Sequence, residues 1–188
     1  MFKLNKDKGM WLTDDLTGHI FDEKLCNSII SFLKEEKAQN LVDFGCGHGL
    51  YTKAINSYGI TTDGYDGNPN TEKISDGFGK VLDLSEKVNL QKKFDFVMSL
   101  EVGEHIPAIY EENFIYNLDQ HNKNGIILSW AIRGQGGDGH FNEKDNEEVI
   151  EIFKKLNYNY DIVASSKLRQ GATLYWFKNT IMVFRRIK

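Results

Sequence analysis

The sequence contains few of the residues that mark several classes of protein. Among its 188 residues there are two cysteines, Cys26 and Cys46, and two prolines, Pro69 and Pro107. Two cysteines exclude a disulfide scaffold and a zinc framework built from cysteine, and they favour a reducing compartment. With so few prolines, no repeat and no low-complexity run, nothing looks like a linker between domains. We therefore expect a single domain over residues 1–188.

Long apolar runs and an excess of basic residues are also missing. No run of 18 apolar residues occurs, and the N-terminus lacks the apolar core of a signal peptide, so we expect a cytoplasmic protein that does not enter the membrane. Lys and Arg total 23 against 27 Asp and Glu, which gives a net charge of −4. This balance argues against nucleic acid as a partner. Hydrophobic residues make up 40% of the chain, enough for one substantial core.

Strand-like and helix-like segments alternate along most of the chain. Strands are predicted at 41–45, 60–67, 80–85, 94–102 and 124–131, and helices at 22–37, 50–59, 107–121 and 145–157. This alternation predicts an α/β fold with a parallel sheet covered on both faces. The runs 160–166 and 179–187 also look like strands, with no full helix between them, so we expect the sheet to close with an antiparallel strand. Residues 167–178 show no clear pattern.

The turn after the first strand of this alternation is rich in glycine. It reads Asp43-Phe44-Gly45-Cys46-Gly47-His48-Gly49, and a helical segment follows. Glycine lets the backbone approach a ligand closely, and the start of a helix offers N–H groups to an anion. Asp66, at the end of the second strand, can accept both hydroxyls of a ribose. An adenosine-like, partly anionic ligand is predicted, although Leu50 stands where the dinucleotide pattern GxGxxG has its last glycine.

This turn resembles the first motif of the class I S-adenosylmethionine-dependent methyltransferases. The resemblance continues in the family's order through residues 64–70, 81–85, 94–107 and 124–130. It is closest to the small bacterial enzymes that act on small molecules. It implies a Rossmann-like, doubly wound, seven-stranded sheet, mostly parallel with an antiparallel C-terminal strand and helices on both faces. Residues 39–188 would then form the core. Because methyl transfer requires the exclusion of water, we expect residues 1–38 to supply an N-terminal lid, best placed at 9–23, and a helix.

The resemblance also implies S-adenosylmethionine as the cofactor, with S-adenosylhomocysteine as the product. Matching positions give the cofactor-binding residues Asp43, Gly45, Gly47, Asp66, Asp83, Leu84, Leu100 and Glu101. By this carry-over Asp43 would lie near the amino group of the cofactor and Asp66 at its ribose. Asp83 and Leu84 would contact the adenine, while Leu100 and Glu101 would lie beneath the sulfonium.

Two histidines follow strand ends at the edge where the methyl acceptor must lie. Either His105 or His140 could act as a general base on a hydroxyl, because histidine has an unperturbed pKa near 6.5. His140 has the stronger case, since its loop (133–142) is long, polar and rich in glycine. We expect this loop to form the acceptor pocket, with Arg133 pairing an anionic group. Further predicted substrate contacts are Gln135 and Asn142 in the loop, and Trp11 and His19 in the N-terminal lid.

The function predicted from these features is methyl transfer to an oxygen of a small polar metabolite containing sugar or phosphate, as in surface-polysaccharide or natural-product pathways. A small-molecule acceptor is the expected partner, and the protein is expected to be a monomer or homodimer. An RNA methyltransferase, a nicotinamide-dependent oxidoreductase and a binding module without turnover remain as alternatives. No metal is predicted, because Glu101, Glu104 and His105 do not match the HxxEH pattern. His121 is expected on an exposed helix surface.

Overall fold

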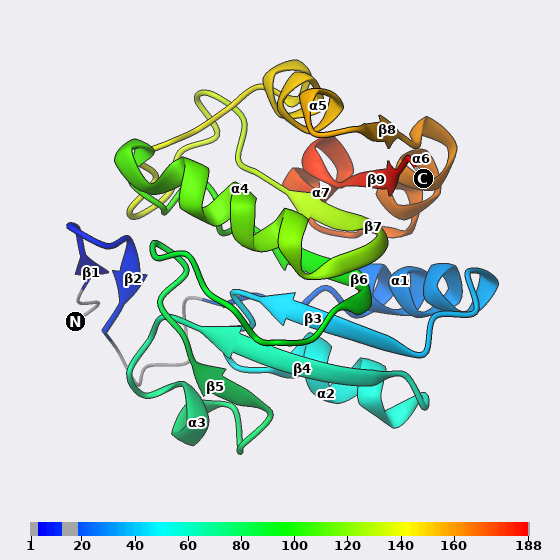
Figure 1. Cartoon of the computed structure of the whole chain (residues 1–188), viewed down its shortest axis with the longest axis horizontal. Helices are drawn as coiled ribbons and strands as arrows, with labels where there is room; N and C mark the ends of the chain where they lie inside the picture. Colours follow the sequence, from blue (N-terminus) through cyan, green and yellow to red (C-terminus); the bar gives the residue numbers. More distant parts are fainter. Residues whose placement is uncertain (1–3, 13–18, 188) are drawn as a thin grey trace.

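One seven-stranded sheet runs through the computed structural model, which describes residues 4–12 and 19–187 (Figure 1). Its strands are β3 (Asn40–Phe44), β4 (Thr61–Asp66), β5 (Gly79–Val81), β6 (Phe94–Leu100), β7 (Asn122–Ser129), β8 (Tyr158–Tyr160) and β9 (Met182–Arg186), and their order in space is β5-β4-β3-β6-β7-β9-β8. Strands β3 to β7 pair in parallel, whereas β9 is antiparallel to both β7 and β8. The predicted α/β sheet, with its antiparallel C-terminal strand, is confirmed.

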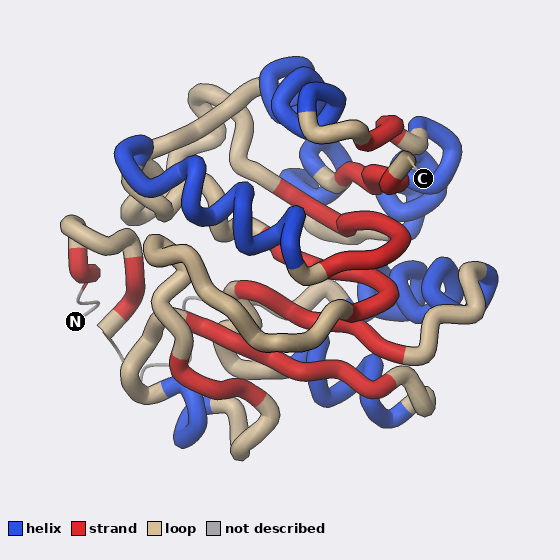
Figure 2. The backbone as a smooth tube through the Cα atoms, viewed as in Figure 1, coloured by secondary structure: helices blue, strands red, loops and turns tan. Residues whose placement is uncertain are grey.

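Helices cover both faces of the sheet (Figure 2). They are α1 (Glu23–Glu35), α2 (Leu50–Ser57), α3 (Thr71–Ile74), α4 (Glu111–Gln120), α5 (Asn146–Lys155), α6 (Ile162–Gly171) and α7 (Tyr175–Thr180), with a 3₁₀ turn at Ala108–Tyr110. Strand residues alternate between two buried clusters: Leu41 packs with α1, α2, α6 and α7, and Val42 packs with α4 and α5. This alternation is the period of two of a strand buried on both sides. No helix in the described part of the chain is long and apolar enough to cross a bilayer.

The predicted strand over residues 160–166 is wrong. Strand β8 ends at Tyr160 and α6 begins at Ile162, with the Asp161 side chain accepting a hydrogen bond from the N–H of Ala164. The β-branched residues Ile162 and Val163 are typical of a strand, and this composition led to the wrong prediction. In the structure both side chains are exposed, with 63% and 65% of their surface accessible, so they do not belong to a buried strand. Aspartate at the N-cap stabilises the start of a helix and decides the structure here. The rest of α6 and α7 occupy the segment that showed no clear pattern.

A short hairpin lies beyond the carboxyl ends of the parallel strands, at the left of Figure 1. It pairs β1 (Leu4–Asn5) with β2 (Met10–Trp11). The tight turn between them brings Gly9 against the loop that follows β6, where an added Cβ at Gly9 would lie 1.9 Å from the carbonyl oxygen of His105. Only glycine permits this approach. Part of the predicted lid segment, residues 13–18, falls outside the described residues.

His121 is buried, contrary to its predicted place on an exposed helix surface. Only 3% of its surface is exposed. Its Nε2 accepts from the N–H of Leu90, and its Nδ1 lies 2.8 Å from the carbonyl oxygen of Asn117. The ring joins α4 to the segment before β6, so this histidine has a structural role.

Candidate active site

A cavity of about 530 Å³ opens at the carboxyl ends of β3, β4 and β6, beneath the hairpin. This volume is within the range of small-molecule sites. Strands β4 and β6 pair on opposite sides of β3, so the cavity lies where the strand order reverses, which is the usual ligand position in such sheets. Predicted residues that line it are Trp11, His19, Asp43, Gly45, Asp66, Asp83, Leu84, Leu100, Glu101, His105, Gln135 and His140. Gly47, Arg133 and Asn142 do not line it.

The glycine turn forms one side of the cavity. Gly45 has a φ of 85°, and an added Cβ would clash with Val102, at 2.1 Å from its Cγ2, so glycine lets the turn pack closely against the loop after β6. The N–H groups of Gly45 and Cys46 both donate to the carbonyl oxygen of Tyr65, at 2.7 and 3.0 Å. These bonds fix the turn to the end of β4.

Asp66 is held in position by two backbone donors. Its Oδ2 accepts from the N–H of Gly47 at 2.9 Å and its Oδ1 from the N–H of Asn68 at 2.8 Å. Each carboxylate oxygen can accept a further bond. Gly47, although outside the cavity wall, therefore acts by orienting Asp66. Asp83 is oriented in a similar way, since its Oδ1 accepts from the N–H and the hydroxyl of Ser85.

Asp43 is a buried carboxyl group with only 3% of its surface exposed. Burial raises its pKa to about 7, although the hydroxyl of Thr52, which donates to Oδ2 at 2.9 Å, favours the charged form. Among the described residues Asp43 takes part in none of the ion pairs formed with Lys or Arg. An ammonium group arriving from a ligand would supply the missing charge. We call Asp43, Gly45, Asp66, Asp83 and Leu84 the donor end of the cavity.

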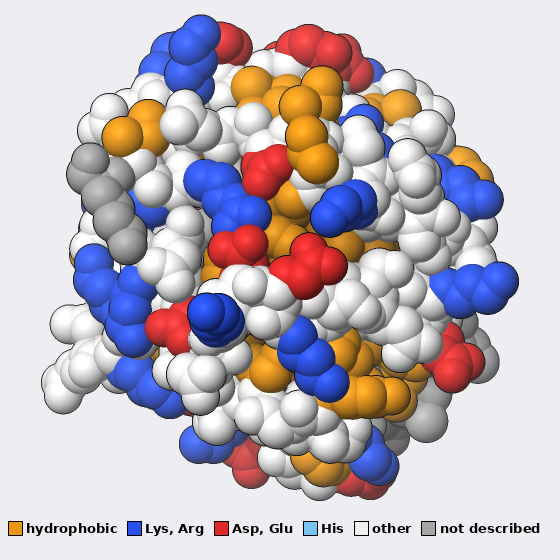
Figure 3. Space-filling model, turned by 90° about the vertical axis from the view of Figure 1, so that its right-hand side faces the viewer, with side chains coloured by type: hydrophobic (Ala, Val, Ile, Leu, Met, Phe, Trp, Pro, Cys, Tyr) orange, Lys and Arg blue, Asp and Glu red, His pale blue; other side chains and the backbone are white. Residues whose placement is uncertain are grey.

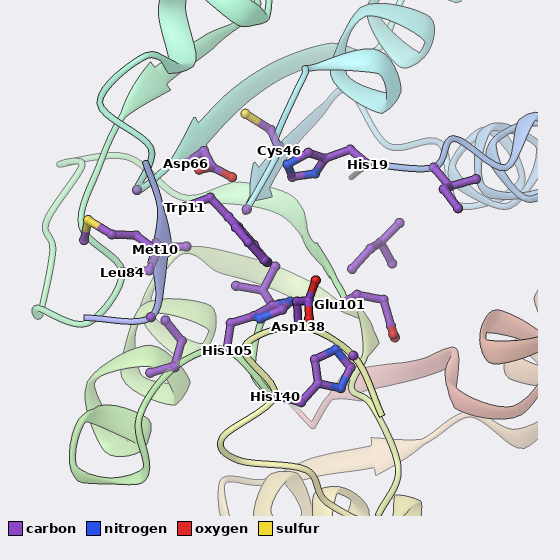
Figure 4. Close-up of a pocket in the computed structure, with 18 of the residues that line it drawn as sticks. Met10, Trp11, His19, Cys46, Asp66, Leu84, Glu101, His105, Asp138 and His140 are labelled. Carbon is purple, nitrogen blue, oxygen red and sulfur yellow. The ribbon is translucent and has the colours of Figure 1, made fainter. Parts of the chain in front are cut away.

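The opposite side of the cavity is built by the two loops that follow β6 and β7. Glu101, His105, Asp138 and His140 lie close together there, and the ring of Trp11 lies near His105, with ring centroids 5.8 Å apart (Figure 4). The rings of His105 and His140 are 5.0 Å apart, and Gln135 donates to Oε2 of Glu101 at 2.8 Å. We call Glu101, His105, Gln135 and His140 the acceptor end.

Burial shifts the pKa values of the carboxyl and imidazole groups at the acceptor end. It raises the pKa of Glu101, even though Ser129 and Gln135 hydrogen-bond to that residue. It also raises the pKa of Glu104 well above the usual value, and the nearby Glu101 adds to the effect. Burial lowers the pKa of His105 to about 4, so its imidazole is neutral at physiological pH.

Glu143 organises the glycine-rich loop, and no sequence signal pointed to it. Its carboxylate accepts from the N–H groups of Gly134 and Gly136, at 2.7 and 3.0 Å, and lies 3.2 Å from Nδ1 of His140. These bonds favour the ionised form and lower the pKa of Glu143 despite burial. An ionised carboxylate accepts only, so Nδ1 of His140 donates to it.

Arg133 and Asn142, both predicted to contact substrate, support the loop from outside the cavity. Arg133 pairs with Asp145 and Glu148 and donates to the carbonyl oxygen of Glu143. Asn142 donates to Glu111, and its carbonyl oxygen accepts from the indole of Trp130 at 2.6 Å. Their polar groups are thus already engaged within the protein.

Several cavity residues were not anticipated. Lys8 and Met10 come from the hairpin, Tyr51 from α2, and Tyr175, Trp176 and Phe177 from α7. Three consecutive aromatic residues at 175–177 were a signal that could have been used. Lys8 lies 3.4 Å from Oδ2 of Asp83 and contacts Glu86, which ties the hairpin to the donor end.

A family model described as a methyltransferase domain matches residues 18–129, more than half of the chain. The chain belongs to this methyltransferase family. The resemblance to the class I S-adenosylmethionine-dependent enzymes is thereby confirmed. The protein is a methyltransferase with S-adenosylmethionine as its cofactor.

Solved structures show the same fold at low sequence identity. Magnesium protoporphyrin IX methyltransferase from Synechocystis PCC 6803, with bound SAH, is 16% identical with a TM-score of 0.67, covering 86% of this chain and 81% of that one. The sugar N-methyltransferase KedS8 from Streptoalloteichus sp ATCC 53650 is 12% identical with a TM-score of 0.69, covering 88% of each chain. CalS10, an amino pentose methyltransferase from Micromonospora echinaspora, is 13% identical with a TM-score of 0.66, covering 86% of this chain and 90% of that one. No curated protein sequence matches the chain.

The donor end of this methyltransferase fits its cofactor. Asp66 has two oriented carboxylate oxygens, and Asp43 lacks a cationic partner among the described side chains. Asp43 would face the amino group, Asp66 the ribose hydroxyls and Leu84 the adenine ring. When bound, the cofactor supplies an electrophilic methyl group on a sulfonium. The protein's task is to orient that group towards the acceptor and to keep water out.

Proposed function

We propose that the protein transfers the methyl group to a hydroxyl oxygen of a small, polar, sugar-like metabolite that carries no net negative charge. The proposal rests on His105 and His140, whose rings are in contact and line the cavity opposite the donor end. His140 is the predicted base. Its hydrogen bond with Glu143 supports this role, because a carboxylate on one imidazole nitrogen orients the ring and stabilises its protonated form.

The charge of the cavity wall favours a neutral acceptor over an anionic one. Carboxylates of Asp66, Asp83, Glu101 and Asp138 line the cavity, whereas Lys8 is its one Lys or Arg within the described part of the chain. Lys8 is itself engaged with Asp83 and Glu86. Arg133, the predicted phosphate partner, lies outside the wall. The phosphate-containing acceptors of the sequence-based prediction therefore find no unengaged Lys or Arg on the described cavity wall.

Two alternatives to this function have less support. The match to a methyltransferase family argues against a nicotinamide-dependent oxidoreductase. An RNA methyltransferase needs a basic surface around its site, whereas acidic side chains outnumber Lys and Arg on the described cavity wall. The opposite end of the molecule shows Lys and Arg interspersed with Asp and Glu (Figure 3). We further propose a cytoplasmic, single-domain enzyme in which the β1–β2 hairpin, with Trp11, closes over the acceptor.

The test is methyl transfer from isotopically labelled S-adenosylmethionine to a panel of neutral sugars, sugar phosphates, amines and short RNAs, read by mass spectrometry. The proposal expects label in a neutral hydroxylated acceptor, released by cleavage conditions that leave N-methyl groups intact. Label confined to phosphorylated compounds, RNA or an amine nitrogen would contradict it. Binding of S-adenosylhomocysteine, measured by calorimetry, shows in the same preparation that the donor end is intact.

A further inference from the structure

Three potential metal ligands converge at the acceptor end. One donor atom each from Glu104, His105 and His140 lies within 4.8 Å of the other two. Glu104 and His105 follow β6 and His140 follows β7, so residues distant in sequence meet at one point. Two imidazoles with one carboxylate are a ligand set that suits Zn²⁺ and other divalent first-row metals.

The side chain of Glu104 is buried and poorly satisfied. It is 0% exposed, and neither carboxylate oxygen has a described donor at hydrogen-bond geometry, although the nearby backbone N–H groups of Glu104 and Ala131 partly favour its charged form. A buried carboxyl group without a good partner stays neutral unless a counter-charge, such as a metal ion, is present to favour its ionised form. Its backbone, in contrast, is well anchored, since its carbonyl oxygen accepts from the N–H groups of Phe141 and Asn142 at 2.8 and 3.0 Å. The side chain is therefore held beside the two histidines.

Both histidines are oriented as metal ligands usually are. Nδ1 of His105 lies 3.0 Å from the carbonyl oxygen of Gly139, and Nδ1 of His140 lies 3.2 Å from the carboxylate of Glu143. A carbonyl and an ionised carboxylate only accept, so each Nδ1 donates a hydrogen bond and each Nε2 is the ring nitrogen left to coordinate an ion. In known metal sites the ligating histidine gives its other N–H to a carbonyl or carboxylate in this way.

We propose that Glu104, His105 and His140 bind one divalent transition-metal ion, such as Zn²⁺, with an open coordination position towards the cavity. Donor atoms around an ion with bonds of about 2.0–2.2 Å stand roughly 3.4 Å apart in a tetrahedral site, so a side-chain adjustment of about 1 Å suffices. His105 and His140 line the cavity, which places the open position where the acceptor enters. This inference revises the expectation that no metal is bound.

The ion's role, unlike its binding, rests on the proposed function. An acceptor hydroxyl at the open position would lose its proton more readily, because a divalent ion stabilises the oxyanion. In that arrangement His140 holds the ion in place of taking the proton, and the carboxylate of Glu101, which lines the same end of the cavity, receives the proton. The two roles are distinguishable through Glu104, which does not line the cavity and which a direct base mechanism does not require.

The experiment measures metal binding without any acceptor. The protein is stripped with a chelator and titrated with Zn²⁺ by calorimetry and with Co²⁺ by visible absorption. One ion per chain is expected, with a Co²⁺ spectrum of low coordination number. Glu104→Gln, which keeps the shape of the side chain, should lower the affinity by about 100-fold or more, and Glu143→Gln by about 10-fold to 100-fold.

His19 and His48 provide the matched control. Their rings lie 4.4 Å apart in the same protein, also facing the cavity region, but outside the cluster. Replacement of His48 by Ala should leave the affinity for Zn²⁺ unchanged. Binding that survives Glu104→Gln and His140→Ala but is lost in the His48 variant would overturn the assignment. If the wild type binds S-adenosylhomocysteine but no metal, the metal site is wrong and the proposed function stands. If it binds metal but no S-adenosylhomocysteine, the result counts against the proposed function alone.

Discussion

The two ends of the cavity are held together by different kinds of contact. At the donor end, the bonds that orient Asp66 come from Gly47 and Asn68, which are 19 and 2 residues away along the chain. At the acceptor end, Gln135 reaches Glu101 and Gly139 reaches His105 across 34 residues in each case. The donor end is thus fixed by adjacent strand ends of the sheet. The acceptor end depends on two loops meeting, so it can change its substrate without changing the fold.

The largest effect is expected from Asp66→Ala at the donor end. Two charge-assisted hydrogen bonds to a ribose contribute about 1.5–3 kcal/mol each, so the affinity for S-adenosylhomocysteine should fall by about 100-fold or more. Calorimetry measures this directly. Asp63→Ala is the control, because Asp63 lies on the same strand and pairs with Lys92 at the surface. Equal affinities of the Asp66 variant and the control would show that Asp66 does not hold the ribose.

Asp22 links α1 to the segment before α7, which carries the aromatic residues of the cavity wall. Its carboxylate caps α1 through the N–H of Leu25 and also accepts from Thr173 and Leu174, at 2.6 and 2.8 Å. Asp22→Ala should lower the free energy of unfolding by about 2–3 kcal/mol, since one helix cap and two further bonds are lost. Urea denaturation followed by circular dichroism gives the value. A change below about 0.5 kcal/mol would show that the link is not important.

Asp22 also makes the stability of the fold depend on pH. Burial alone would raise the pKa of Asp22, but the N–H groups of Leu174, Leu25 and Thr173 lower it overall. Its contribution is therefore present above the unfolded pKa of about 3.9 and is lost as the pH falls through the lower folded value. The difference in unfolding free energy between the wild type and Asp22→Asn should shrink below about pH 4. A difference that stays constant from pH 7 to pH 3 would contradict this.

A substitution in the acceptor-end loop should lower turnover without changing the affinity for the cofactor product. Glu143→Gln weakens the bonds to Gly134, Gly136 and His140, so we expect turnover to fall by about 10-fold or more, as for partners that orient functional groups. The affinity for S-adenosylhomocysteine should not change. Glu151→Gln, a surface residue paired with Lys154, is the control. An equal loss of affinity and turnover would mean that the two ends are not separate.

The smallest effect concerns Asp43 and pH. Its pKa of about 7 in the free protein means that it binds a proton which the unfolded chain, at about 3.9, releases. Its contribution to stability is therefore full below about pH 4 and is lost as the pH rises through 7. An ammonium ligand favours the ionised form, so S-adenosylhomocysteine should bind a few-fold more tightly at pH 8 than at pH 6. Asp43→Asn should remove this dependence, and an unchanged profile in the variant would assign it to another group.

The sequence was sufficient for the parts of the molecule that depend on local pattern. Strands β3, β4, β6 and β7, the glycine turn and Asp66 follow from periodicity and from a motif, and the structure brings the turn and Asp66 together at one edge of the sheet. The strand predicted at 80–85 is instead the short β5, which ends at Val81. The sequence was not sufficient where a tertiary contact decides. Arg133 looked available for an anionic substrate, yet it pairs with Asp145 and Glu148, partners that no spacing rule indicated.

Similar reasons account for the other differences. The β-branched residues Ile162 and Val163 suggested a strand, but the cap at Asp161 begins a helix whose buried face is Ala164 and Leu168. The hairpin that brings Lys8 to the cavity has only two residues in each strand, too few for a periodic signal. The role of Glu143 could not be predicted, because its contacts with Gly134, Gly136 and His140 form only when the loop is folded.

The central claim, one cavity with a donor end and an acceptor end, is tested most directly by a crystal structure with S-adenosylhomocysteine. The account predicts the ribose hydroxyls on Asp66, the adenine against Leu84, and the sulfur directed towards the side chains of His105 and His140. A nucleoside bound elsewhere, or one whose sulfur points away from those two histidines, would contradict it.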